Sequence, residues 1–402
     1  MAGWIKLKAG GAATRMSGVE LIAGVNEVQV HPFTPFDDRV VDFLGKLSRS
    51  LLKITKYPDV MTFGYYCRRA NIIALKKSFD DSQCRLGRGL IFHITPSNMP
   101  VNFAYSFLFG LLSGNANVVR VSSKEYPQTS IICSILDELL ADYEQLRLGT
   151  SFIRYPHDDQ ITAYYSSICH GRIIWGGDQT IEDIRKHTIP PRSIDITFAD
   201  RFSLCVLNSE AIVSLNEQQI KELAHGFYND TYLIDQNACS SPYLVLWQGS
   251  DIMNAQTRFW EAVFEESRRY AISDINAVEK YTQLCCASID RMELSYAKRY
   301  ENLVYTLKLD SLPDNMVNLK GKYGFFYEYP FTEWEQIAPL IGTKVQTITY
   351  YGIQPESIIS IIKQIGLLGI DRIVPVGRAL DIGVIWDGMD ILRLLSRIIE
   401  VK

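Results

Sequence analysis

The sequence predicts a doubly wound α/β fold built from two domains. Residues 88–124 read as a strand, a tight turn, a helix and a strand, which is the building block of a nucleotide-binding sheet. Strand-like and helix-like runs then alternate along the remaining chain, as parallel sheets with crossover helices require. With 402 residues, the chain is too long for one simple hydrophobic core, so two domains are expected.

The unit at residues 88–124 shows this pattern most clearly. Gly89–Thr95 is mostly apolar, as a buried parallel strand should be. Residues 96–100 interrupt it, and we expect a helix to begin at Pro100, where a missing N–H costs nothing. Ser113-Gly114 is a usual helix end, and Asn117–Val121 is a second run typical of a strand.

Shorter runs give the remaining elements. Apolar residues three and four positions apart predict helices, and β-branched or aromatic runs between turn residues predict strands. The predicted helices begin at Asp37 or Asp38 and at Pro127, and cover 62–77, 158–167, 180–187, 220–227, 281–289 and 391–398. The further predicted strands are 4–8, 27–30, 152–155, 172–175, 194–198, 204–207, 243–247, 323–327, 345–350 and 372–374.

Composition excludes several classes of protein. Forty-one basic and 45 acidic residues give a net charge of −4, which argues against nucleic acid as a partner. The apolar run Met99–Leu112 is interrupted by Asn102 and is too short to span a membrane. The eight cysteines form no CxxC pair and no signal core is evident, so we expect reduced thiols and a cytoplasmic location. The six histidines lack metal-ligand spacing, so no metal is expected.

Cys239 is the first candidate for chemistry, because it lies in a polar loop between a helix and a strand. A free cysteine is commonly a small buried hydrophobic residue, and we give the other seven that interpretation. A thiolate in such a loop can instead attack an acyl carbon and form a thioester. Asn98 is either a turn former ahead of a helix or a donor to an oxyanion.

Three segments resemble the aldehyde dehydrogenase superfamily. Thr95–Pro100 resembles its Pro-x-Asn-x-Pro turn, and residues 113–121 resemble its Gly-Asn-x-Val-Val-x-Lys strand. Asp235–Cys239 is similar to the Gly-Gln-x-Cys segment that carries the nucleophile. The resemblance implies an aldehyde-dehydrogenase-like fold with a Rossmann-like cofactor domain and an α/β catalytic domain. It also makes Cys239 the nucleophile and Asn98 an oxyanion donor, together with the Cys239 backbone N–H.

The same resemblance implies a nicotinamide cofactor. Gly176-Gly177 is similar to the superfamily's Thr-Gly-Ser segment, where a helix N-terminus faces the pyrophosphate. Ser123 occupies the place of an acidic residue that binds the ribose in NAD-specific members, which favours NADPH. The cofactor-binding residues implied in this way are Thr95, Pro96, Arg120, Ser122, Ser123, Gly176, Gly177 and Glu328.

One departure from the superfamily is informative. Aldehyde-oxidising members carry a glutamate, in Leu-Glu-Leu-Gly-Gly, that activates water to hydrolyse the thioester. The matching stretch here is Ile196–Asp200, with Phe198 or Ala199 at the place of that glutamate. Without a general base, attack by water should be slow, which fits exchange of the acyl group with a thiol. A local shift of the alignment would make Asp200 the base.

The run Asp371–Gly388 looks like the closing signature of the long-chain acyl-CoA or acyl-protein thioester reductases of the bacterial luminescence (LuxC) type. With the other motifs, this resemblance covers about residues 60–400. Arg378 in this run either binds an anionic acyl donor or forms a structural ion pair. We expect a dinucleotide-binding domain with its lead-in at 1–205, a catalytic domain at 206–370 and a closing segment at 371–402.

The resemblance implies an NADPH-dependent reductase that converts a fatty acyl thioester into a fatty aldehyde through Cys239. Fatty acyl-CoA or an acylated protein is the expected donor, an acyl-protein synthetase is an expected partner, and a homo-oligomer is the usual assembly. Two alternatives stay open. One is reduction of an acyl phosphate or acyl adenylate, and the other is a non-redox acyl carrier or transferase that uses Cys239.

Overall fold

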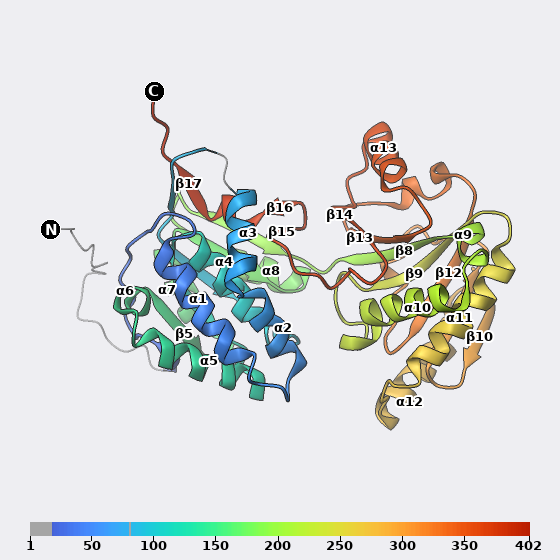
Figure 1. Cartoon of the computed structure of the whole chain (residues 1–402), viewed down its shortest axis with the longest axis horizontal. Helices are drawn as coiled ribbons and strands as arrows, with labels where there is room; N and C mark the ends of the chain where they lie inside the picture. The colour runs from blue at the N-terminus through green and yellow to red at the C-terminus, as the bar shows by residue number, and fades with distance from the viewer. Residues whose placement is uncertain (1–17, 80–81) are drawn as a thin grey trace. The chain divides into compact units, whose positions relative to one another are not determined.

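A computed structural model describes residues 18–79 and 82–402, and the chain forms two compact units. The first unit comprises residues 1–199 and 389–402, and the second comprises residues 200–388. The chain therefore enters the second unit after Ala199 and leaves it after Gly388 (Figure 1). The expected closing segment at 371–402 is divided between the two units, and the predicted strand at 4–8 lies outside the described residues.

The first unit contains a six-stranded sheet with the order β1-β5-β4-β3-β6-β7. Only β1 runs antiparallel to its neighbour, and the other pairs are parallel. The chain goes from β3 outward to β4 and β5, then returns to place β6 on the other side of β3, so a topological switch point lies between β3 and β6. The strands are β1 (Glu20–Gly24), β3 (Leu90–Ile94), β4 (Ala116–Arg120), β5 (Thr150–Arg154), β6 (Gly171–Trp175) and β7 (Ile194–Phe198).

Helices cover this sheet, and their ends follow ordinary capping chemistry. The Asp37 and Asp158 side chains accept hydrogen bonds from the first backbone N–H groups of α1 and α7, and Pro127 begins α5. The helices of the first unit are α1 (Asp38–Leu51), α2 (Pro58–Tyr66), α3 (Arg69–Phe79), α4 (Asn102–Leu112), α5 (Pro127–Leu140), α6 (Glu144–Leu148), α7 (Asp159–Ile168), α8 (Asp178–Arg185) and α14 (Ile391–Leu394).

The second unit contains a seven-stranded sheet with the order β10-β11-β12-β9-β8-β13-β14, parallel except for β10. Its strands are β8 (Phe202–Asn208), β9 (Pro242–Gln248), β10 (Leu294–Tyr300), β11 (Val304–Leu309), β12 (Phe325–Phe331), β13 (Val345–Tyr351) and β14 (Arg372–Pro375). Its helices are α9 (Ser209–Val213), α10 (Glu217–Thr231), α11 (Ile252–Ser267), α12 (Asp274–Asp290), α13 (Pro355–Ile365) and the short 3₁₀ turn η1 (Tyr232–Ile234).

Both faces of the second sheet are buried. Successive side chains of a strand point to opposite faces. On β8, Leu204 and Val206 therefore join one hydrophobic cluster, whereas Cys205 and Leu207 join the cluster on the other face. The α/β architecture predicted from the sequence is confirmed in both units. In the described parts of the chain, no helix combines the length and apolar composition of a membrane span.

Several predicted elements differ from the structure. In place of the single helix predicted at 62–77 there are two helices, α2 and α3. The strand predicted at 27–30 lies earlier in the chain, as β1. Helix α4 begins at Asn102, since Pro100 lies in the preceding turn and the Asn102 N–H bonds back to the Met99 carbonyl (3.3 Å).

The predicted C-terminal helix at 391–398 is wrong. Helix α14 ends at Leu394, and β17 (Ser396–Ile398) pairs antiparallel with β2 (Arg85–Gly87). The Leu394 carbonyl accepts a hydrogen bond from Arg88, and the Leu395 carbonyl accepts one from Asn115 (2.9 Å). Side chains remote in sequence thus satisfy the carbonyls at this helix end.

Candidate active site

Cys239 lies in a loop of the second unit, between η1 and β9. The loop begins with Asp235 and Gln236 in the left-handed region, with φ values of 55° and 61°. The buried Gln236 side chain donates to the carbonyls of Pro242 (3.0 Å) and Phe325 (3.1 Å). Its carbonyl oxygen accepts the backbone N–H groups of Gly324 and Phe325 (3.2 Å each). Gln236 therefore ties the loop to the first residue of β9 and to the start of β12.

Further hydrogen bonds fix the backbone on either side of the nucleophile. The Ser203 hydroxyl on β8 donates to the Cys239 carbonyl (2.6 Å). The Ser241 hydroxyl donates to the Asp230 carbonyl (2.7 Å) at the end of α10. The buried Asp230 carboxylate accepts the N–H groups of Gly377 (2.6 Å) and Ala379 (2.8 Å). This arrangement connects the nucleophile loop with the loop after β14.

The Cys239 side chain is partly exposed, and its environment opposes ionisation. Burial of the thiol, together with the charge of Asp387, raises the pKa of Cys239 to about 11. A hydrogen bond from Gln346 and the charge of Arg201 oppose this shift. The thiol is therefore protonated at neutral pH, and a group that removes its proton would increase its reactivity.

A pocket with a mixed polar and apolar lining lies beside this loop, within the second unit. It has a volume of about 300 Å³, which is at the small end of the range for ligand sites. Ser240, the residue after the nucleophile, forms part of its wall, together with Gln346, Arg372 and Asp387.

Asn98, the predicted oxyanion donor, is exposed in the loop between β3 and α4 of the first unit. Its side chain is thus accessible to a substrate. The role of Asn98 stays a prediction.

Four predicted cofactor residues lie at the switch point of the first sheet. Thr95 and Pro96 follow β3, and Gly176 and Gly177 follow β6. Gly177 caps α8 with φ −68°, and a Cβ built there meets no atom within 4 Å. The carboxyl ends of strands at a switch point are where open α/β sheets bind ligands. The space around Gly177 is compatible with close approach of a pyrophosphate to the helix N-terminus.

The three predicted residues after β4 contact the end of β5. Arg120 donates to the Tyr155 carbonyl (3.3 Å) and lies over the Tyr155 ring, 4.5 Å from its centroid. The Ser123 hydroxyl donates to the same carbonyl (3.2 Å), and Arg154 donates to the Ser122 carbonyl (3.2 Å). Two arginines therefore approach this edge of the sheet.

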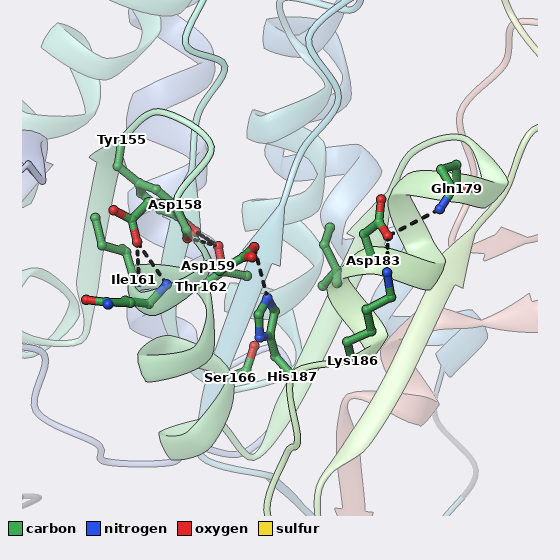
Figure 2. A network of polar contacts seen from close by, with 12 residues as sticks. Tyr155, Asp158, Asp159, Ile161, Thr162, Ser166, Gln179, Asp183, Lys186 and His187 are labelled. Atoms are coloured by element: carbon green, nitrogen blue, oxygen red, sulfur yellow. Dashed lines mark hydrogen bonds and ion pairs between the residues drawn. The ribbon is translucent and has the colours of Figure 1, made fainter.

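Polar side chains at α7 and α8 mainly bond to groups of their own helix (Figure 2). Asp158 accepts two backbone N–H groups of the first turn of α7 (2.9 Å each). On α8, Asp183 accepts from Lys186 (2.6 Å) and Gln179 (3.2 Å), and Figure 2 shows both partners converging on its carboxylate. These residues stabilise the helices, and we assign none of them to a ligand.

Phe198, which with Ala199 is one of the two residues predicted at the place of the superfamily's general base, is part of an aromatic pair. Phe198 ends β7, is 4% exposed and stacks on Trp175, with ring centroids 3.9 Å apart. Asp200, the alternative base, forms an ion pair with Lys320 (2.5 Å). Phe198 has no carboxylate that could replace the superfamily's glutamate. The carboxylate of Asp200 already has a cationic partner.

Glu328 lies in the interior of the second unit. Its Oε2 atom accepts hydrogen bonds from the indole N–H groups of Trp247 (2.7 Å) and Trp260 (2.8 Å) and from Gln256 (2.9 Å). The residue is 4% exposed. Three protein donors thus hold one oxygen of this buried carboxylate, and a contact of Glu328 with the cofactor ribose stays a prediction.

Arg378 forms an exposed ion pair with Asp381 (2.9 Å), which is one of its two predicted roles. Gln346, Asp387 and Arg201, which influence the pKa of Cys239, were not predicted from the sequence. Asp387-Gly388, at the end of the run Asp371–Gly388, is a dipeptide typical of turns. This dipeptide is the sequence feature that could have indicated Asp387. Within residues 18–79 and 82–402, no group of three acidic, histidine or cysteine residues is placed to hold a metal.

Comparisons with known proteins agree with the motifs. The family model described as acyl-CoA reductase (LuxC) matches residues 70–305, more than half of the chain. The long-chain acyl-protein thioester reductase of Vibrio harveyi is 23% identical over 269 residues, which cover 66% of this chain and 51% of that protein. The protein of the same name from Aliivibrio fischeri is 21% identical over 323 residues, 78% of this chain and 64% of that one. The chain thus spans between about half and two thirds of the length of these curated relatives.

Solved structures show the same fold. The 1-pyrroline-5-carboxylate dehydrogenase from Thermus, solved with bound NAD, has a TM-score of 0.60 and 12% identity, covering 90% of this chain and 80% of that one. A lactaldehyde dehydrogenase has a TM-score of 0.59 and 13% identity, covering 84% and 78%. These likenesses confirm the predicted aldehyde-dehydrogenase-like fold. The match of the family model over residues 70–305 shows that the chain belongs to the acyl-CoA reductase (LuxC) family.

Proposed function

We propose that the chain reduces a long-chain fatty acyl thioester to a fatty aldehyde with NADPH. The observation that carries this proposal is the placement of Cys239. It lies in a rigid polar loop, next to a residue that lines a pocket, in a chain of the acyl-CoA reductase family. The names of the curated relatives support an acylated protein as donor, and fatty acyl-CoA is the alternative donor.

The residues at the edge of the first sheet fit a dinucleotide. Gly177 leaves open space at the N-terminus of α8, and Arg120 has a buried Nε atom without a hydrogen-bond partner in the described part of the chain. Thr95, Pro96, Gly176 and Gly177 would hold the pyrophosphate. Arg120, Ser122 and Ser123 would hold the adenosine ribose, with the nearby Arg154 favouring a 2′-phosphate and hence NADPH. When bound, the nicotinamide supplies a hydride.

The remaining chemistry belongs to the side chains. The Cys239 sulfur attacks the acyl carbon, and the donor thiol leaves. The Asn98 amide and the Cys239 backbone N–H stabilise the oxyanion. Because Phe198 or Ala199 would stand where the superfamily has its general base, attack of water on the acyl-enzyme would be slow, and reduction would compete successfully with hydrolysis.

Some expectations about the cell stay predictions. An acyl-protein synthetase would supply the acylated donor, and a homo-oligomer is the assembly that the superfamily suggests. All eight cysteines are free, as a reducing, cytoplasmic location requires.

The test is NADPH oxidation on addition of tetradecanoyl-CoA, with analysis of the product. We expect tetradecanal from the wild type and no turnover from Cys239→Ala, whereas NADPH binding should be the same in both. Cys286→Ala, which removes an exposed thiol on α12, is the matched control and should keep full activity. Turnover by Cys239→Ala would refute the proposal. Absence of saturable NADPH binding would favour a non-redox acyl carrier, and reduction of an acyl phosphate alone would favour that alternative substrate.

A further inference from the structure

Asp387 is a buried carboxylate in the pocket beside the nucleophile loop. Its side chain is 5% exposed. The Gln346 side-chain amide donates a hydrogen bond to it, and Arg201 Nη1 lies 3.6 Å from its Oδ2 atom. Arg201 also pairs with Asp371 (2.6 Å). The positive charge of this guanidinium is therefore shared, and it compensates the negative charge of Asp387 only in part.

The backbone holds this carboxylate in a defined place. Asp387 has φ 48° and Gly388 has φ 72°, both in the left-handed region. Aspartate and asparagine tolerate that region better than most residues. A Cβ at Gly388 would lie 2.8 Å from the Asp371 carboxylate, so the turn needs glycine there. The turn thus brings two carboxylates close to Arg201.

Gln346 connects Asp387 with the nucleophile. Its amide donates a hydrogen bond to Asp387, and its side chain lowers the pKa of Cys239. Gln346 and Asp387 line the same pocket as Ser240, the residue that follows Cys239. The charge of Asp387 raises the pKa of Cys239, and burial raises the pKa of Asp387 itself. Each group therefore disfavours ionisation of the other, so that the pair carries one negative charge more readily than two.

Other ionisable groups also face this pair. Arg201 lowers the pKa of both Cys239 and Asp387, and Asp371 raises that of Asp387. Arg372 and Tyr243 also interact electrostatically with Cys239. Arg372 lines the same pocket, where its side chain donates to the Ala379 carbonyl (2.7 Å).

We propose that Asp387, positioned by Gln346 and Arg201, accepts the proton of Cys239 during acyl transfer. This proposal rests on the proposed function. In the step, the S–H bond of Cys239 breaks and a bond forms between its sulfur and the acyl carbon. The bond between that carbon and the donor sulfur breaks, and the proton passes from Asp387 to the departing thiolate. No atom is oxidised or reduced in this step.

The first test needs no acyl donor. Alkylation of Cys239 by iodoacetamide is followed by mass spectrometry across a range of pH. Asp387→Asn keeps a residue suited to the left-handed turn and removes the negative charge, so alkylation at neutral pH should become about tenfold faster and the pH profile should move down. Gln346→Ala should slow alkylation. Asp314→Asn, at an exposed position of the same unit away from the pocket, should leave it unchanged. An unaltered pH profile for Asp387→Asn would overturn the coupling.

The second test measures acylation of Cys239 by tetradecanoyl-CoA. Asp387→Asn should acylate roughly 100-fold more slowly although its thiol alkylates faster, since a proton acceptor has been lost. Asp387→Glu should recover part of the rate. Simple loss of structure would lower both rates together, so opposite changes identify proton transfer. Equal acylation by the variant and the wild type would refute the acceptor role. Absence of acylation in the wild type would refute the proposed function, and the alkylation profiles would still decide whether Asp387 and Cys239 are coupled.

Discussion

The two regions that the proposed reaction needs are built in different ways. At the edge of the first sheet, short turns follow β3 and β6, and the important features are backbone groups and open space around Gly177. In the second unit, the nucleophile loop is fixed by side chains such as Gln236 and Ser203, which bond to other strands. Substitutions in the first region should therefore abolish binding or catalysis without lowering the stability of the fold. Substitutions in the second region should lower stability as well.

Among the variants that compare the two regions, the largest effect is expected for Asn98→Ala. Because Asn98 is exposed, its removal should not lower stability, but loss of an oxyanion donor should lower kcat by roughly 10²-fold. Steady-state kinetics with tetradecanoyl-CoA measure the change, and Ser97→Ala on the same loop is the control. An unchanged kcat for Asn98→Ala would leave Asn98 with a turn-forming role only.

Gln236→Ala should lower the free energy of unfolding by about 3 kcal/mol. It removes a buried side chain that makes four hydrogen bonds to backbone groups, and these groups stay buried without partners. Urea denaturation measures the loss. The exposed neighbour Asn237 makes a single side-chain bond (3.2 Å), so Asn237→Ala should cost far less. Equal stabilities of the two variants would contradict the contrast between the regions.

Gly177→Leu tests the first region without disturbing its fold. An added side chain meets no protein atom within 4 Å of Cβ and φ is ordinary, so stability should stay the same. The side chain would occupy the space proposed for the pyrophosphate, and the Kd for NADPH should rise about tenfold. Gly342→Leu, at an equally open position of the second unit, should leave the Kd unchanged. Normal NADPH affinity in Gly177→Leu would place the cofactor elsewhere.

The last prediction concerns pH. Burial raises the pKa of Asp230 to about 7, above the value of about 3.9 expected in the unfolded chain. Between these values the folded state binds more protons, so the contribution of Asp230 to stability is complete below pH ~4 and is lost as pH rises through ~7. Unfolding midpoints measured across this range should fall less steeply in Asp230→Asn than in the wild type. Parallel pH profiles would contradict the raised pKa.

The sequence predicted the parts of this molecule whose causes are local. The strand–turn–helix–strand unit at 88–124 was predicted closely, because apolar runs and breaking residues define it. The end of α14 could not be predicted, since Arg88 and Asn115, some 300 residues earlier in the chain, satisfy its carbonyls. Asp387 was missed for the same reason: its proximity to Cys239 follows from the packing of β8, β13 and the C-terminal run, and no spacing in the sequence expresses it.

The central claim is that Cys239 carries the acyl group and passes it on to reduction. The most direct measurement mixes the protein with tetradecanoyl-CoA alone, identifies the adduct by peptide mass spectrometry, and then adds NADPH. We expect a tetradecanoyl group on Cys239 that persists in water and disappears on addition of NADPH, with release of tetradecanal. An adduct on another residue, or one that hydrolyses to the fatty acid as fast as it is reduced, would contradict it.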